Sequence, residues 1–272
     1  MSASAPARPA SIRARLAAGD TLAGMQSFSA SPVLVEAMGH AGLDFVVVDM
    51  EHCPTGLETL VELVRTCDGC GIVPLTRIPD LDAKTIGRCL DVGVAGIVLP
   101  HASPARCRAA LAAAWYAPKG ERGACPVVRA AGYLPPDWNE YARAANDDVL
   151  VVPLVEDAEG LAAIEEIFAI DGIDVVFLGP FDLSISLGLG GVDFRHPRMA
   201  AILADVVACA RHHGKYVLTT VGATIDNDYA ATLIGAGARL LSFSADVAVF
   251  MAACRRAVGV RDECVRAATS PR

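Results

Sequence analysis

The sequence has no long apolar run and no cluster of basic residues. Charges and glycines interrupt every apolar stretch before it reaches the roughly 18 residues that a membrane-spanning helix needs. The 23 Lys and Arg are outnumbered by 31 Asp and Glu, for a formal net charge of -8, and phosphate backbones are bound by clustered Lys and Arg. We therefore expect neither a membrane protein nor a nucleic-acid-binding protein.

A signal-peptide core and a paired cysteine framework are also missing. The N-terminal stretch "MSASAPARPASIRARL" lacks the apolar core of about 7 to 15 residues that a signal peptide carries, so residues 1–14 are expected to be a disordered lead-in and the protein cytoplasmic. The nine cysteines are scattered, as expected for small apolar residues in a reducing compartment. One close pair, Cys67 and Cys70, has no second pair at zinc-site spacing, so we interpret it as part of a helix end near Gly69 and Gly71.

The chain shows one repeating rhythm, in which a short apolar run is followed by a turn and an amphipathic segment. A length of 272 residues suits one α/β barrel domain, expected over residues 15–268. The predicted strands are 21–28, 45–49, 72–77, 96–100, 149–156, 174–179, 215–220 and 238–244. The predicted helices are 57–68, 82–92, 104–115, 158–168, 197–212, 226–235 and 246–267.

Eight such β-then-α units are typical of a TIM-type (β/α)8 barrel, which is the predicted fold. A doubly wound sheet is the alternative, but it favours a glycine-rich phosphate-binding turn after the first strand. The stretch "GMQSFSASP" has no GxGxxG spacing there, and the later "GLGLGG" has the wrong spacing for a nucleotide site.

Polar residues follow the predicted strands at the barrel end where active sites of this fold lie. The second strand runs into Asp49, Glu51 and His52, and later strands end near the residues Arg77, His101, Glu156 and Asp182. Any one of these side chains alone could be a solvated loop residue. Five successive strands that deliver such groups to one rim predict a functional site.

Glu156 and Asp182 close adjacent predicted strands, so their carboxylates should reach one cation. Two carboxylates without Cys or His select a hard divalent ion such as Mg²⁺, Mn²⁺ or Co²⁺, which can polarise a ketone. His52 could then transfer a proton near neutral pH, and Arg77 could stabilise a developing oxyanion. We expect Asp49 and Glu51 to orient His52 or to bind metal-bound water, although Glu51 could be a solvated loop charge.

Several longer stretches carry a resemblance to a known family. "DMEHCPTG", "TRIPDLDAKTIGRCLDVGVAGIVLPH", "KGERGACPVVRAAGY", "VPLVEDAEG" and "GPFDLSISLG…HP" resemble, in order and spacing, the class II pyruvate aldolases of the HpcH/HpaI aldolase/citrate lyase family, over about residues 15–260. The resemblance implies a lyase that reversibly cleaves a 4-hydroxy-2-oxo acid into pyruvate and an aldehyde through a metal-stabilised enolate. It also implies a barrel whose C-terminal helix is exchanged between subunits of a homo-oligomer, a hexamer built as a trimer of dimers.

The resemblance assigns roles position by position. It implies that His52 is the catalytic base, that Arg77 steadies the enolate and the substrate ketone, and that Asp91 raises the basicity of that histidine. It further implies that Glu156 and Asp182 are the metal ligands and that the backbone around Phe181 and Asp182 binds the pyruvate carboxylate. The implied site residues are His52, Arg77, Asp91, Glu156, Phe181 and Asp182.

Two positions depart from the family pattern. Leu154 stands where many members carry a substrate-contacting Gln, and Phe181 stands where many have Ala, which would narrow the pocket and change the preferred aldehyde. Arg122 and Arg129 flank a glycine-containing loop at the expected entrance of the site, where they could steer anionic substrates, or they are ordinary surface charges. The alternatives to an aldolase are a non-catalytic barrel that binds a keto acid, and a citrate-lyase-like enzyme acting on a CoA thioester.

Overall fold

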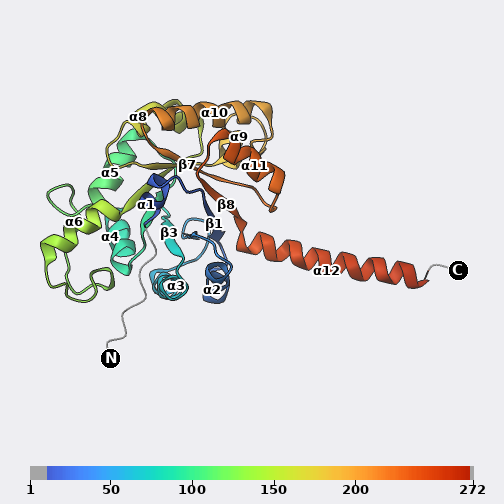
Figure 1. Cartoon of the computed structure of the whole chain (residues 1–272), viewed down its shortest axis with the longest axis horizontal. Coiled ribbons are helices and arrows are strands. Elements are labelled where there is room, and N and C mark those ends of the chain that lie inside the picture. Colours follow the sequence, from blue (N-terminus) through green and yellow to red (C-terminus); the bar gives the residue numbers. More distant parts are fainter. Residues whose placement is uncertain (1–10, 270–272) are drawn as a thin grey trace.

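Eight parallel strands form a closed barrel in the computed structural model, which describes residues 11–269 (Figure 1). Each strand pairs with the next in chain order, and the last pairs with the first. The strands are β1 (Leu22–Ser27), β2 (Phe45–Asp49), β3 (Val73–Arg77), β4 (Gly96–Leu99), β5 (Leu150–Val155), β6 (Val175–Leu178), β7 (Tyr216–Thr220) and β8 (Leu240–Ala245). The predicted (β/α)8 barrel is confirmed, and closure rules out the doubly wound sheet.

The helices lie mostly outside the barrel and run back from each strand end to the start of the next strand (Figure 1). They are α1 (Ile12–Ala17), α2 (Pro32–His40), α3 (Leu57–Cys70), α4 (Ala83–Val92), α5 (Pro104–Ala114), η1 (Arg129–Ala131), α6 (Trp138–Asp148), α7 (Ala158–Ala162), α8 (Ile164–Phe168), α9 (Pro180–Ser186), α10 (Pro197–His212), α11 (Asn227–Ala236) and α12 (Asp246–Thr269). The expected helix 158–168 is two short helices. Sequence periodicity missed α1, α2, η1, α6 and α9.

The strands bury both of their faces, which is why their sequences are continuous apolar runs. In β2, Phe45 and Val47 point into the barrel interior, whereas Val46 and Val48 join the layer of side chains between the barrel and its helices. Side chains alternate along a strand, so two separate cores arise from one run of sequence. The inner core fills the barrel and leaves the site at its rim.

The first helix closes the N-terminal end of the barrel. Ile12 and Leu16 of α1 are buried in the inner core. The Arg13 guanidinium donates hydrogen bonds of 2.9 Å to the carbonyls of Asp147 and Val149, which precede strand β5. The disordered lead-in expected over residues 1–14 is therefore wrong for its last residues, because helix α1 begins at Ile12. Residues 1–10 of that prediction lie outside the described part of the chain.

The cysteine pair is structural, as predicted. Cys67 is buried on the inner face of α3, and the helix ends after Cys70, where Gly71 adopts a left-handed conformation with φ of 76°. Burial is the main reason that the pKa of the Cys67 thiol is raised. Within residues 11–269, no helix has the length and apolar character to cross a membrane.

Candidate active site

A buried ion pair joins the ends of the second and third strands. Asp49 and Arg77 are the last residues of β2 and β3 and lie opposite each other in the register of the two strands. Arg77 Nε donates a 2.7 Å hydrogen bond to Asp49 Oδ1, and both side chains are at least nine-tenths buried. The parallel pairing therefore sets the position of the guanidinium at the C-terminal rim of the barrel.

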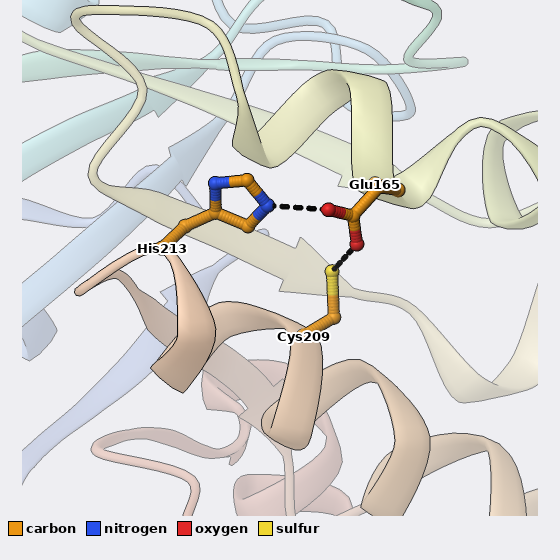
Figure 2. A group of neighbouring side chains, drawn as sticks. All are labelled: Glu165, Cys209 and His213. Atoms are coloured by element: carbon orange, nitrogen blue, oxygen red, sulfur yellow. Dashed lines mark hydrogen bonds and ion pairs between the residues drawn. The ribbon is translucent and has the colours of Figure 1, made fainter.

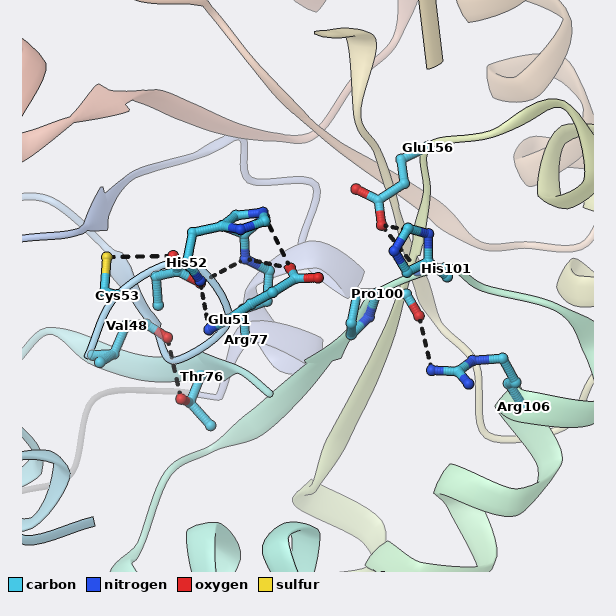
Figure 3. A network of polar contacts seen from close by, with 11 residues as sticks. Val48, Glu51, His52, Cys53, Thr76, Arg77, Pro100, His101, Arg106 and Glu156 are labelled. Atoms are coloured by element: carbon cyan, nitrogen blue, oxygen red, sulfur yellow. Dashed lines mark hydrogen bonds and ion pairs between the residues drawn. The ribbon is translucent and has the colours of Figure 1, made fainter. Parts of the chain in front are cut away.

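The same aspartate organises the loop that follows β2. Its carboxylate accepts 3.1 Å hydrogen bonds from the backbone N–H groups of Glu51 and His52, and the Cys53 thiol donates to it at 3.5 Å (Figure 3). An aspartate that binds the backbone two and three residues further along holds a tight turn. Asp49 thus orients the loop that carries His52, one of the two roles expected for it.

The charges of Asp49 and Arg77 stabilise each other. Burial by itself raises the pKa of Asp49, but the hydrogen bond and charge of Arg77, together with the two backbone N–H donors, outweigh it and hold that pKa below its ordinary value. Burial lowers the pKa of Arg77, and Asp49 more than reverses this. Both groups are therefore charged at neutral pH, and the arginine is a permanent cation at the rim.

Glu51 and His52 extend this group toward the opening. Glu51 Oε2 lies 3.3 Å from Arg77 Nε and 3.7 Å from His52 Nε2, and this buried oxygen accepts no aligned hydrogen bond. The His52 side chain is 60% exposed, so its ring faces the space above the barrel (Figure 3). The histidine is accessible to a bound molecule, and the glutamate has an oxygen free for a further ligand.

Glu156 lies on the opposite side of the same opening, directly after β5. Its Oε1 accepts a 2.9 Å hydrogen bond from the backbone N–H of His101, whose φ of 49° places it in the left-handed region (Figure 3). Burial raises the pKa of the Glu156 carboxyl, and the nearby charges of Glu51 and Asp182 add to this against the influence of His101. His101 therefore forms a turn at the end of β4, and its backbone N–H holds the Glu156 carboxylate.

Asp182 is the third residue of α9, which begins directly after β6. Its carboxylate is exposed and close enough to Glu156 to raise the pKa of that residue. The neighbouring Phe181 side chain is 60% exposed and lies beside Gly191, so it borders the rim. The prediction that Glu156 and Asp182 lie near each other agrees with this placement on adjacent strand ends.

These carboxylates fit a divalent cation. Glu51, Glu156 and Asp182 approach one opening from three strand ends, and Glu51 Oε2 is a buried acceptor without a donor. Burial raises the pKa of Glu156, and the charges of Glu51 and Asp182 raise it further. A set of oxygen donors with excess negative charge suits a hard ion. The residues present are therefore of the kind that holds a divalent metal ion.

Asp91 is not brought to His52 within one chain. It lies at the end of α4, the helix that returns toward the N-terminal end of the barrel, and its Oδ1 accepts a 2.7 Å hydrogen bond from Arg122 Nη2. Among residues 11–269 no hydrogen bond or ion pair joins Asp91 to His52. This separation follows from the direction of α4, which runs from the end of β3 back to the start of β4.

Arg122 and Arg129 do not flank the entrance. They belong to the segment between α5 and β5, which leads to a strand start. The Arg122 guanidinium is buried over the Tyr116 ring at 4.4 Å and borders a cavity of about 250 Å³ near the N-terminal ends of the strands. Arg129 is paired with Asp68. The expectation of substrate steering is wrong for this chain on its own, since both cations are held at the other end of the barrel.

One residue of the rim was missed by the sequence analysis. Asp246, the first residue of α12, is buried and accepts hydrogen bonds from the backbone N–H of Phe28 at 2.9 Å and from the Ser27 hydroxyl at 3.1 Å. The Phe28 ring lies 5.8 Å from the Arg77 guanidinium carbon. Asp246 thus anchors the loop after β1 beside Arg77, and its position directly after the last strand was the available signal.

Comparisons with known proteins show what this chain is similar to. A family model described as HpcH/HpaI aldolase/citrate lyase matches residues 22–253. The chain is 38% identical over 180 residues, 66% of this chain and 69% of the relative, to a 2-dehydro-3,6-dideoxy-6-sulfogluconate aldolase of Pseudomonas putida. It is 31% identical over 245 residues, 87% of this chain and 93% of the relative, to a 5-keto-4-deoxy-D-glucarate aldolase of Salmonella paratyphi C.

A solved structure shares the whole barrel. The crystal structure of an HpcH/HpaI aldolase from Desulfitobacterium hafniense superposes with a TM-score of 0.87 at 28% identity, covering 93% of this chain and 96% of that one. This likeness extends across all eight strands and the helices that surround them.

The buried ion pair makes a prediction about stability. Asp49→Asn should lower the free energy of unfolding at pH 7 by about 3–5 kcal/mol, because it leaves the Arg77 charge buried without its partner. The folded-state pKa of Asp49 is depressed, so its contribution is complete above the unfolded value of about 3.9 and is lost as the pH falls toward the folded pKa. The difference between wild type and variant in urea unfolding should therefore shrink below about pH 4. The exposed Asp171→Asn is the control, and a difference that stays constant with pH would contradict the assignment.

Proposed function

The chain belongs to the HpcH/HpaI aldolase/citrate lyase family and is a lyase of the aldolase type, and on that premise we propose that it reversibly cleaves a 4-hydroxy-2-oxo acid into pyruvate and an aldehyde. The observation that carries this proposal is the rim itself. A permanently charged Arg77, an accessible His52 and a group of carboxylates around Glu156 face one opening. A protein that merely bound a keto acid would have no use for a proton acceptor beside these charges.

Glu156 and Asp182 would hold a divalent cation, with Mg²⁺, Mn²⁺ or Co²⁺ as the candidates. When bound, the cation supplies Lewis-acid polarisation of the 2-oxo group of the substrate. Burial raises the pKa of Glu156, and the charges of Glu51 and Asp182 raise it further. A cation between the carboxylates would offset this repulsion, which supports the assignment. Glu51 is placed to accept a hydrogen bond from a water at the same site.

Arg77 would stabilise negative charge on the 2-oxo oxygen. Its guanidinium is held by Asp49 and needs little reorganisation when charge develops, which is the condition for effective electrostatic stabilisation. His52 would take the proton from the C4 hydroxyl. The aldehyde carbonyl then forms as the C3–C4 bond breaks, the bonding pair passes into the pyruvate enolate, and protonation at C3 yields pyruvate.

The remaining assignments concern binding and support. Backbone N–H groups at Phe181 and Asp182 open helix α9 and would meet the substrate carboxylate. Leu154 is buried in the inner core and offers no hydrogen bond at the rim, so discrimination between aldehydes would rest on other side chains such as exposed Phe181. Asp91 would support the basicity of His52 from a partner subunit, because α4 carries it away from the His52 of its own chain.

We also propose a homo-oligomer in which α12 is exchanged between subunits, consistent with a trimer of dimers. This helix of 24 residues projects away from the barrel (Figure 1). It bears an apolar stripe at helical spacing that includes Val247, Phe250, Met251 and Val258, all of them exposed in the single chain. An exposed stripe of this kind is typical of a surface that a partner covers.

The metal assignment predicts that chelation abolishes pyruvate release and that Mg²⁺ or Mn²⁺ restores it. Release from a panel of 4-hydroxy-2-oxo acids, followed by a coupled assay, measures this. Glu156→Gln should not be rescued at metal concentrations that saturate the wild type, because a ligand has been lost. Full activity of the wild type in excess chelator would refute the metal role.

The base assignment predicts a separation of turnover from binding. His52→Ala should lower turnover by about 10² to 10⁴, while oxalate, a pyruvate-like dianion, still binds in the presence of Mg²⁺. Glu156→Ala should lose both turnover and oxalate binding. Calorimetry with oxalate compares the two variants, with exposed His40→Ala as the control. If His52→Ala binds no oxalate, His52 is a ligand or a structural group and the proposed mechanism fails.

The exchange of α12 predicts a change of mass in solution. Phe250→Glu places a charge in the apolar stripe and should convert the oligomer into smaller species or aggregates, as measured by light scattering. Deletion of the whole helix would be a poorer test, because it also removes buried Asp246. Arg256→Glu changes the charge on the opposite side of the helix and should leave the mass unchanged. An unaltered mass for Phe250→Glu would contradict the proposal.

A further inference from the structure

Three side chains of different ligand chemistry meet on the outer layer of the barrel. Glu165 comes from α8, Cys209 from the last turns of α10, and His213 directly follows that helix (Figure 2). The Cys209 thiol donates to Glu165 Oε2 at 3.0 Å, and His213 Nε2 lies 2.7 Å from Glu165 Oε1. The ligand atoms lie within 4.8 Å of one another.

The arrangement follows from helix geometry. Cys209 and His213 are four residues apart, so they lie on one face of the last turn, and that face packs against α8. The imidazole is stacked on Phe168 with a centroid distance of 6.4 Å and an interplanar angle of 15°, and its side chain is 20% exposed. Two of the three groups are thus held in place by packing, and the exposed Glu165 can adjust to them.

We propose that Glu165, Cys209 and His213 form a zinc-binding site that ties helix α8 to helix α10. Thiolate, imidazole and carboxylate together select a borderline-soft ion such as Zn²⁺, in contrast to the oxygen-only set at the rim. Three protein ligands leave one tetrahedral position for water. On binding, the Cys209 thiol releases its proton to solvent, the sulfur binds the ion, and the hydrogen bonds to Glu165 are replaced by coordination.

The distances are compatible with this change. Zn–N and Zn–O bonds of about 2.0–2.2 Å and a Zn–S bond of about 2.3 Å place tetrahedral ligand atoms about 3.3–3.7 Å apart. The Cys209 thiol and the His213 ring contact different oxygens of Glu165, at 3.0 and 2.7 Å, and all the ligand atoms lie within 4.8 Å of one another. The groups must therefore shift by roughly 1 Å to reach tetrahedral spacing. Glu165, with a side chain that is 69% exposed, is free to make that movement.

A nucleophilic role for this cysteine is less favourable. Burial and the adjoining Glu165 carboxylate raise the pKa of the Cys209 thiol to about 12, so without a cation there is little thiolate at neutral pH. The cluster is also remote from the catalytic rim, because α8 and α10 end just before the starts of β6 and β7. The proposed zinc site therefore lies apart from the catalytic rim, and it does not depend on the proposed aldolase activity.

Cobalt provides the direct probe. Full-length protein without an affinity tag, kept in excess Mg²⁺ to occupy the oxygen site, should bind Co²⁺ and show a thiolate-to-cobalt charge-transfer band. Cys209→Ser should abolish the band, whereas Cys125→Ser, which removes another half-buried thiol, should keep it. His213→Gln and Glu165→Gln should each weaken binding by at least about 100-fold, the upper end of the loss seen for groups that merely support a ligand. A missing band, or one that survives in Cys209→Ser, overturns the proposal.

Zinc itself tests the structural role. Added Zn²⁺ should raise the unfolding temperature of the wild type and of Cys125→Ser, because a ligand that binds the folded state stabilises it. It should not raise that of Cys209→Ser or His213→Gln. Pyruvate release in Mg²⁺ should be unaffected by Cys209→Ser, which separates this result from a failure of the proposed function. An equal temperature shift in all variants would show that zinc binds elsewhere and would refute the site.

Discussion

The candidate active site depends on the buried contact between Asp49 and Arg77. Parallel pairing of β2 with β3 places the two residues opposite each other, and the carboxylate then holds both the guanidinium and the loop that carries His52. A buried ion pair adds little net stability, because desolvation offsets the attraction between the charges. Its effect here is positional, since it fixes a cation and a histidine on one side of an opening whose other side is lined by Glu156.

The two ends of the barrel differ in how their charged side chains are arranged. At the C-terminal ends of the strands, carboxylates are left close together with few cations to neutralise them, which suits binding of a metal ion and an anionic substrate. At the N-terminal ends, charges are paired and packed. Helix α1 closes the barrel, Arg122 is buried between Asp91 and Tyr116, and the α8 and α10 ends meet through Glu165. Stability is thus concentrated away from the residues that must remain accessible.

The two proposed metal sites differ in the chemistry of their donors. The rim offers oxygen atoms, which suit an ion that keeps exchangeable waters and can receive a substrate. The cluster of Glu165, Cys209 and His213 offers sulfur and nitrogen beside one carboxylate, which suits a borderline-soft ion such as Zn²⁺. The two sites would therefore favour different ions.

The sequence by itself determined the barrel and the residues of its rim. Alternating buried side chains make eight continuous apolar runs, and in a parallel barrel the residue after each run must lie at the same end, so the rim positions of His52, Arg77 and Glu156 follow from strand ends alone. The short helices α1 and α9 were missed because they have too few turns to show a period. The tertiary structure alone decided which groups touch. Asp49 pairs with Arg77 through strand register, Asp91 is carried away by the direction of α4, and Glu165 meets Cys209 because two helices distant in sequence pack side by side. Such contacts depend on distances in space, which no local pattern encodes.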